Sequence, residues 1–391
     1  MPARAYDIVL FGATGFAGRL TAEYLARHAP NDCRWALAGR NVGKLENVRA
    51  QLAAIDPALS TLRLLEGDSG DPASLRAIAG DARVIASTVG PYIVHGEPLV
   101  AACAEAGTDY LDLTGEPEFV DTMYVRYHDR ARRSGARLVH ACGFDSIPYD
   151  IGAYYTVLQL PEDVPLTVHG YVEASGRPSG GTAHSAITAF SRFPALIAAA
   201  RDRKRAEPAV TRRSVQAGAG RPHHAAATGG WALPMPTLDP QIVGRSARAL
   251  DRYGPDFRYS HCASVPHLWT AAGLAVGVGG LVALAQLPPA RNALLKRMPQ
   301  GNGPSPQQRA RSWFRVTFTG EGGGQRVVTR VSGGDPGYDE TARMLGESAL
   351  ALALDDLPET SGQVTTAAAM GDALLARLQK SGMSFEVLES S

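Results

Sequence analysis

Four side chains that could donate or carry a proton follow apolar runs in this sequence. Tyr92 follows the fourth such run, and Asp145, Ser146 and Tyr149 follow the sixth. The neutral hydroxyls of Ser146 and Tyr149 could donate a hydrogen bond to a carbonyl or enolate oxygen, and so could that of Tyr92. Asp145 could donate a proton if its surroundings raised its pKa. These four residues are the candidates for catalysis.

Two of these residues also have structural interpretations. Tyr92 comes after Pro91, so it could fill a turn or pack on a bound cofactor ring. Asp145 stands before a predicted helix with Pro148 in its first turn, so it could cap that helix. The sequence leaves both alternatives open.

A glycine-rich turn near the start of the chain could bind a phosphate-containing ligand. The apolar run 8–11 is typical of a buried parallel strand, and glycines follow it at positions 12, 15 and 18, before a helix expected at 16–28. This spacing allows a sharp turn, close approach of a pyrophosphate, and packing of the helix on the strand. The free N–H groups of the helix then face an anion. We predict a dinucleotide site, with a structural turn as the alternative. The expected contacts are Gly12, Thr14, Gly15, Phe16 and Gly18.

The ends of the next strands predict the remainder of the dinucleotide site. After a second strand, Arg40 is the first charged residue, and Lys44 follows one helical turn later. An arginine here accommodates the 2′-phosphate of NADP, whereas NAD needs an acidic residue, so we predict NADP(H). A solvated arginine that opens a helix is the alternative. Asp68 could accept from the adenine amino group or cap the next helix. The nicotinamide should lie beside Thr88, Val89 and Gly90, which follow the fourth strand.

Alternating strands and helices between residues 1 and 147 predict an α/β fold, a Rossmann-type doubly wound parallel sheet. The expected strands are 8–11, 34–38, 62–65, 83–87, 109–113 and 136–140. Beyond residue 148 we expect an α+β substrate and dimerisation domain (148–355), followed by a C-terminal helical segment (356–391). Its predicted elements are a strand at 166–172, an antiparallel pair at 313–319 and 326–331, and amphipathic helices at 339–354 and 366–380.

Composition excludes several classes of protein and site. The chain has 391 residues and a formal net charge of +1, which gives no reason to expect a nucleic acid partner. Its four cysteines lack metal-binding spacing, and neither they nor the histidines indicate a metal site. Scattered cysteines and an N-terminus that leads directly into the first strand favour a cytoplasmic protein.

One uncharged segment needs a covering partner. Residues 268–287 contain no charged side chain over 20 positions, which is the length of a membrane span. They are rich in glycine and alanine, so a buried or dimer-interface segment is the favoured interpretation. We therefore expect a homodimer. Peripheral contact with a membrane or lipid surface is the alternative.

Longer motifs resemble a known group of enzymes. The stretches GATGFAG (12–18), AGR (38–40), TVGPY (88–92), YLDLTGE (110–116) and GFDSIPYDIG (143–152) resemble the saccharopine-dehydrogenase-like oxidoreductases. Residues 303–324, 333–353 and 365–387 resemble the actinobacterial trans-acting enoyl reductase branch of that family. The resemblance covers nearly the whole chain and is weakest between 205 and 260.

The resemblance implies an activity and a partner. It implies that NADPH reduces an enoyl group on an acyl chain, held by a carrier protein or polyketide synthase that lacks its own enoyl reductase, in the formation of phthiocerol and phenolphthiocerol type lipids. It also implies that the last helices return to the first domain. The basic segment 201–213 could then meet an acidic carrier protein, although such a run is usually a solvated face.

Two other functions remain open at this stage. A saccharopine-type amino-acid dehydrogenase would reduce an imine and would need inward-facing arginines for its carboxylates. A non-catalytic lipid-surface protein would keep its nucleotide as a structural or sensing ligand, and the uncharged segment 268–287 is its main support.

Overall fold

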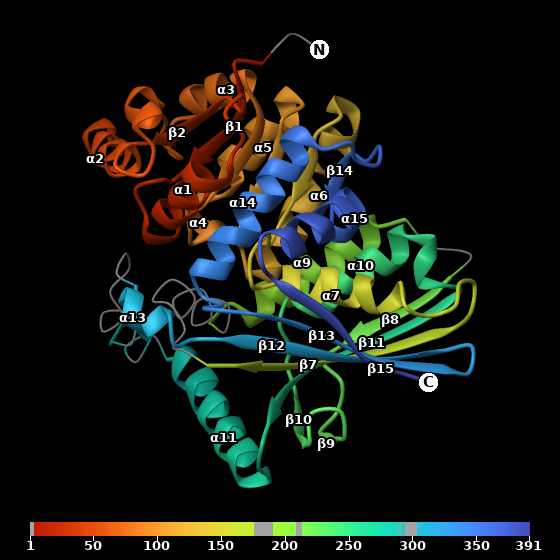
Figure 1. Ribbon diagram of the computed structural model, residues 1–391. Helices are drawn as coiled ribbons and strands as arrows, with labels where there is room; N and C mark the ends of the chain where they lie inside the picture. The colour runs from red at the N-terminus through yellow and green to blue at the C-terminus, as the bar shows by residue number, and fades with distance from the viewer. Residues whose placement is uncertain (1–3, 176–190, 209–212, 288, 290, 294–302) are drawn as a thin grey trace.

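The computed structural model describes residues 4–175, 191–208, 213–287, 289, 291–293 and 303–391 (Figure 1). Within this part of the chain, parallel strands form one sheet of seven. They are β1 (Tyr6–Phe11), β2 (Trp35–Gly39), β3 (Arg63–Glu66), β4 (Ala82–Ser87), β5 (Asp109–Asp112), β6 (Arg137–Val139) and β14 (Gly362–Val364). Their spatial order is β14-β6-β5-β4-β1-β2-β3, with every neighbouring pair parallel. The predicted Rossmann-type sheet is confirmed.

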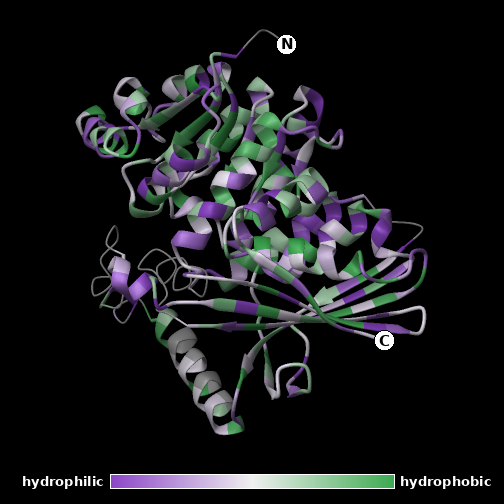
Figure 2. Cartoon of the chain, in the orientation of Figure 1, coloured by the Kyte–Doolittle hydropathy of each residue, from purple (hydrophilic) through white to green (hydrophobic). Residues whose placement is uncertain are grey.

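Helices alternate with these strands along the chain. They are α1 (Phe16–His28), α2 (Val42–Ala53), α3 (Pro72–Asp81), α4 (Tyr92–His95), α5 (Glu97–Ala106) and α6 (Pro117–Ser134), with a 3₁₀ turn at Pro57–Thr61. Side-chain caps set where two of them begin, because Asn41 accepts from the Lys44 N–H and Asp71 from the Ala73 N–H. Helices α5 and α6 end at glycines in the left-handed region, Gly107 and Gly135. Figure 2 shows the sheet that these helices cover as mainly hydrophobic, since most of its strands are buried on both faces, with the edge strand β3 as an exception.

A second, mixed sheet lies beyond α7 (Ile147–Val157). Its strands are β7 (Leu166–Ala174), β8 (Ser214–Gly218), β9 (His223–Ala225), β10 (Gly230–Pro234), β11 (Asp256–Val265), β12 (Phe314–Gly322), β13 (Gln325–Gly333) and β15 (Ser384–Ser390). Their order is β15-β13-β12-β7-β11-β10-β9, with β8 beside β11. The predicted antiparallel pair is confirmed as β12 and β13. The described helices of this region are α9 (Phe193–Ala206), α10 (Asp239–Ala249), α11 (Leu268–Ala285) and α13 (Pro306–Arg309), with a 3₁₀ turn at Asp251–Tyr253.

The C-terminal helices return to the first sheet, as the resemblance implies. They are α14 (Asp339–Leu354) and α15 (Thr366–Lys380), at the predicted positions. Helix α14 packs on α1 and β4, and Gly346 of α14 lies directly against the ring of Tyr24. Strand β14 then joins the edge of the first sheet, and β15 ends in the second. The last fifty residues therefore connect both sheets.

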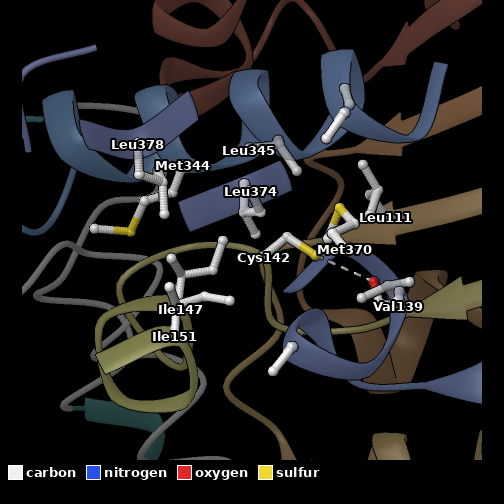
Figure 3. Close-up of a cluster of buried hydrophobic side chains, with 14 of the residues drawn as sticks. Leu111, Val139, Cys142, Ile147, Ile151, Met344, Leu345, Met370, Leu374 and Leu378 are labelled. Carbon is white, nitrogen blue, oxygen red and sulfur yellow. Dashed lines mark hydrogen bonds between the residues drawn. The ribbon is translucent and has the colours of Figure 1, made fainter. Parts of the chain in front are cut away.

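One hydrophobic core runs between the two parts of the molecule. Figure 3 shows Leu111 and Val139 of the first sheet beside Met370 of α15, with Met344 and Leu345 of α14 in the same buried cluster. The same cluster continues through side chains of α7 and α15, and all are buried. Helix α7 also packs on the second sheet, because Gly152 leaves room for the ring of Phe318. Helix α7 therefore packs between the second sheet and the core that it shares with the first.

The segment 268–287 forms helix α11 through Ala285 and is not buried within the chain, so that part of the expectation is wrong. It leads away from the body of the molecule in Figure 1 and contacts β10 and β11. Trp269 and Val276 are 74% and 77% exposed, and Leu268, Leu284 and Leu287 are also exposed. The glycines at 273 and 280 have open space where a side chain would stand. Among the described residues, no helix is long and apolar enough to cross a membrane.

Candidate functional site

The turn after β1 requires glycine at two positions. Gly12 has a φ of +89°, and a Cβ atom there would lie 2.6 Å from Cγ2 of Val89 and 2.8 Å from Oγ1 of Thr88. A Cβ atom on Gly18 would lie 2.3 Å from the carbonyl oxygen of Gly12. The hydroxyl of Thr88 donates to that same oxygen at 3.1 Å. The turn is therefore packed against the end of β4, where the nicotinamide is expected.

The start of α1 fits a pyrophosphate. Its N-cap is Gly15, which is exposed and offers no side-chain cap to the first-turn N–H groups. Those groups and the helix dipole favour an anion. Thr14 lies half-buried just before them. Phe16 packs edge-on against Tyr338, with 4.7 Å between ring centres, and the guanidinium of Arg309 lies 5.7 Å from its ring centre. The second part of the chain thus borders the predicted cofactor site.

The other predicted cofactor residues lie at the same edge of the sheet. Arg40 follows β2 and is exposed, as is Lys44 in the first turn of α2. Asp68 accepts from the Gly70 N–H at 2.8 Å, and the cap of α3 is Asp71 rather than Asp68. The capping alternative for Asp68 is therefore wrong. Gly90 is exposed beyond β4. The residues present fit NADPH, with first-turn N–H groups that no side chain caps for the pyrophosphate and a cation where the 2′-phosphate is expected.

Tyr92 has a structural position, which is the kind of role that the sequence left open as the alternative to catalysis. It is buried, and its hydroxyl donates to the Ser87 carbonyl at 3.0 Å while accepting from the Leu113 N–H at 3.1 Å. Glu116 accepts from the N–H groups of Tyr92 and Ile93. These bonds join the loops after β4 and β5. Because the hydroxyl hydrogen of Tyr92 is already used, we withdraw Tyr92 as a proton donor.

Asp145 lies half-buried beside the loop after β5. The Cβ position of Gly115 is 3.1 Å from its carboxyl carbon. Loss of solvent, with a smaller contribution from the nearby Glu116 carboxylate, raises the pKa of Asp145 to about 6. The N-cap of α7 is Ser146, not Asp145. The capping alternative for Asp145 is therefore wrong, and its carboxyl group can hold a proton close to neutral pH.

Ser146 belongs to a buried polar cluster with Asp239 and His261, which the sequence analysis did not predict. Its hydroxyl is hydrogen-bonded to Oδ1 of Asp239 at 3.3 Å, and the hydroxyl of Thr237 donates to Oδ2 at 2.5 Å. Nε2 of His261 lies 3.5 Å from the same Oδ2. Asp239 begins α10 and His261 lies on β11, far from Ser146 in sequence. A lone aspartate and a lone histidine carry no motif, so no signal in the sequence joins them.

Tyr149 completes the group from one turn further along α7. Its ring packs edge-on against that of His261, with 4.7 Å between ring centres. The hydroxyl of Tyr259 lies 3.0 Å from Nδ1 of His261. Burial raises the pKa of Tyr149 well above its usual value, and nearby Asp239 and Asp145 add to the shift. Burial also lowers the pKa of His261 to about 3. Both side chains are therefore neutral near pH 7.

The basic segment 201–213 is not a uniform solvated face. Arg203 is buried and pairs with Asp121 of α6 at 2.6 Å and with Glu207. Arg213 donates to backbone carbonyls at the end of α10. Arg201, Lys204 and Arg205 are exposed on α9, while Arg212 lies outside the described residues. Arg203 and Arg213 therefore cannot serve a docking surface. The described residues also contain no cluster of histidine, cysteine and acidic groups able to hold a metal ion.

Comparison with known proteins identifies the relatives of this chain. Residues 8–139 match the saccharopine dehydrogenase NADP binding domain. A Mycobacterium tuberculosis protein provisionally named a trans-acting enoyl reductase is 41% identical over 98% of this chain and 97% of its own length. The trans-acting enoyl reductase of Mycobacterium ulcerans is 38% identical over 97% of both chains. Apo saccharopine dehydrogenase (L-Glu forming) from Saccharomyces cerevisiae shares the fold, with a TM-score of 0.56 and 12% identity over 98% of this chain and 99% of its own.

These findings confirm the resemblance and the predicted cofactor. The matched domain contains the glycine turn, Arg40 and the ends of strands β1 to β6. The similarity to the mycobacterial proteins extends over nearly the full length of both chains. The chain is an NADPH-dependent oxidoreductase and belongs to the trans-acting enoyl reductase family.

Proposed function

We propose that this protein uses NADPH to reduce the carbon–carbon double bond of an enoyl thioester, on an acyl chain presented by a polyketide synthase or carrier protein. The observation that carries the proposal is the position of Asp145, Ser146 and Tyr149. They begin α7 at the edge of the first sheet where the glycine turn also lies. The names of the relatives support the reaction. The resemblance supports phthiocerol-type lipids as the product class.

The reaction requires groups that these residues supply. Conjugate reduction needs a hydride at the β-carbon, a donor to the enolate oxygen and a proton for the α-carbon. NADPH, when bound, supplies the hydride. The hydroxyls of Ser146 and Tyr149 suit the enolate oxygen because both are neutral donors. Asp145 suits the α-carbon because its pKa of about 6 lets it hold a proton near neutral pH.

The cofactor contacts remain those predicted from the sequence. We propose that the pyrophosphate meets the start of α1 and that Arg40 and Lys44 hold the 2′-phosphate. Asp68 would face the adenine, and Val89 would border the nicotinamide. The proposed contacts are Gly12, Thr14, Gly15, Phe16, Gly18, Arg40, Lys44, Asp68, Thr88, Val89 and Gly90.

A matched pair of tyrosines on α7 tests the proposed donor. Tyr149→Phe should lower kcat for an enoyl thioester of pantetheine about 100-fold, because one donor to the enolate oxygen is lost. Tyr155→Phe is the control, since its hydroxyl bonds only weakly to the Phe385 carbonyl at 3.4 Å. NADPH binding, followed by fluorescence, should be equal in both variants. Unchanged turnover by Tyr149→Phe would remove Tyr149 from the mechanism.

Two surfaces suit the partners that the proposal requires. The exposed basic residues of α9, which are Arg201, Lys204 and Arg205, would attract an acidic carrier protein. The exposed apolar side of α11 would pack against α11 of a second copy, because its open glycines allow two helices to approach closely. We propose that residues 1–147 form the NADP-binding domain, 148–355 the substrate and dimerisation domain, and 356–391 the segment that closes the structure, with α14 at the end of the middle part packed on the first sheet.

A further inference from the structure

Ser146 can donate a hydrogen bond to the substrate only if its hydroxyl hydrogen is not already donated to another group. A serine hydroxyl has one hydrogen, so it can donate to one acceptor at a time. Ser146 is buried and hydrogen-bonded to Oδ1 of Asp239. If Asp239 is an ionised carboxylate, it takes that hydrogen, and Ser146 has none left for a substrate oxygen. If Asp239 is protonated, it can donate to Ser146, whose own hydrogen becomes available.

The surroundings of Asp239 favour the protonated form. Its side chain is 4% exposed, and the side chains hydrogen-bonded to it are the hydroxyls of Ser146 and Thr237, beside one backbone N–H, its own. Within the described part of the chain, the only basic group within ion-pair distance is His261. Nε2 of His261 is buried and makes no hydrogen bond to the described residues. Burying a carboxylate without a cation is costly, and protonation avoids that cost.

The other charged and titratable groups near Asp239 do not change this balance. From the neighbouring elements, Tyr149 of α7 and Tyr259 of β11 are neutral, and Asp145 before α7 is an acid that repels negative charge. Further along α10, Arg245 pairs with Glu207, and Arg203 pairs with Asp121. The start of α10 favours an anion, but this effect is small beside the cost of burial. Desolvation accordingly raises the pKa of Asp239 well above its usual value.

We infer that Asp239 is a neutral carboxylic acid that donates its proton in a hydrogen bond to Ser146 and so directs the Ser146 hydroxyl hydrogen toward the substrate oxygen. Asp239 is a positioning residue, since it acts through Ser146. Thr237 fixes which oxygen carries the proton, because its hydroxyl donates to Oδ2 and leaves Oδ1 to face Ser146. This inference rests on the proposed function.

The activities of Asp239→Asn and Asp239→Ala show whether the protonated or the ionised form of Asp239 is required. Asp239→Asn has the same shape and can donate from its amide nitrogen to Ser146 while its oxygen accepts from Thr237. It should keep kcat within about threefold of the parent. It should also lose the decline in activity that ionisation of Asp239 causes at alkaline pH. Asp239→Ala should lower kcat about 100-fold, because Ser146 is no longer oriented. If the carboxylate is the required form, Asp239→Asn should instead be as inactive as Asp239→Ala.

A spectroscopic measurement tests the inference without turnover. The infrared difference between the parent and Asp239→Asn at neutral pH should contain the carbonyl band of a protonated carboxylic acid. A carboxylate band in its place would overturn the inference. NADPH titration of each variant establishes that it is folded. If the parent itself reduces no enoyl thioester, the proposed function fails, whereas the infrared result still decides the state of Asp239.

Discussion

The carboxyl group of Asp145 should make stability depend on pH. Its pKa of about 6 in the folded protein exceeds its reference value of 3.8. The folded state therefore binds more protons than the unfolded state between these values, and stability falls as pH rises from about 4 to 6. At pH 7 the free energy of unfolding of Asp145→Asn should be about 1 to 3 kcal/mol higher than that of the parent. The lower value applies if solvent screens the partly exposed carboxylate.

The gap between these two proteins should narrow as pH falls below 6 and should nearly close at about pH 3, below both pKa values, where the parent is mostly protonated in both states. Denaturant unfolding at several pH values provides the measurement. Asp202→Asn, at an exposed carboxylate of α9, is the control for charge alone. An equal stability of the parent and Asp145→Asn at pH 7 would contradict a raised pKa at this residue.

Two glycine-to-alanine substitutions should have opposite effects. Gly12→Ala should destabilise the protein by about 1 to 3 kcal/mol and abolish NADPH binding, because Gly12 has a positive φ and its Cβ would collide with Val89. Gly80→Ala, in α3 and with nothing within 4 Å of its Cβ position, should stabilise the protein by up to about 1 kcal/mol. Thermal unfolding and NADPH titration test both. Retained binding in Gly12→Ala would show that the turn does not hold the cofactor.

At the residue scale, the sequence predicts positions set by local geometry and misses those set by tertiary contacts. The glycine turn was predictable because its spacing reflects the path of one strand and one helix. The hydrogen-bond partners of Tyr92 and the roles of Asp239 and His261 were not predictable. The Tyr92 hydroxyl accepts a hydrogen bond from Leu113, which is 21 residues away in the sequence. Asp239 is hydrogen-bonded to Ser146, which is 93 residues away in the sequence. No local pattern records such contacts.

At the scale of elements, a buried charge cluster joins α6, α9 and α10. Arg203 pairs with Asp121, and Arg245 pairs with Glu207 at 3.3 Å. Arg203→Met should destabilise the protein by about 3 to 5 kcal/mol, since Asp121 would remain buried without its cation. Arg205→Met is the control, because that side chain is 73% exposed and its nearest acid is 3.6 Å away. Equal stability of the two variants would contradict a role for the cluster.

The exposed side of α9 makes a separate prediction. Reversing the charge of Arg201, Lys204 and Arg205 together should leave the fold intact and weaken binding of an acidic carrier protein. The salt dependence of that binding should weaken too. Lys380→Glu, exposed on α15, is the control for net charge. Unchanged affinity would remove α9 as the docking surface.

Periodicity predicted the elements better than it predicted their surroundings. The helices at 16–28, 339–354 and 366–380 were predicted at their observed bounds, because each carries a regular apolar face. The apolar segment 268–287 is also helical through Ala285, yet its described large side chains are exposed. Hydrophobicity indicates that a segment needs cover, but it does not identify the covering surface.

At the scale of the whole molecule, α11 should determine the oligomeric state. Val276→Glu should convert a dimer to monomers, because Val276 is exposed in the middle of α11. NADPH binding should be retained, because α11 contacts β10 and β11 of the second sheet, whereas the cofactor site is at the first sheet. Val125→Glu, at an exposed valine of α6, is the control. Sedimentation gives the result. If the parent protein is already monomeric and binds lipid vesicles through α11, then a lipid surface and not a second copy covers this helix.

The most direct test of the proposed function follows NADPH absorbance after the purified protein is mixed with an enoyl thioester of pantetheine. The same assay is repeated with a glutamate-derived imine. The enoyl reductase proposal predicts oxidation of NADPH and formation of the saturated thioester, with no turnover of the imine. Turnover of the imine alone would indicate an amino-acid dehydrogenase with the same fold, and would contradict the role assigned here to Asp145, Ser146 and Tyr149.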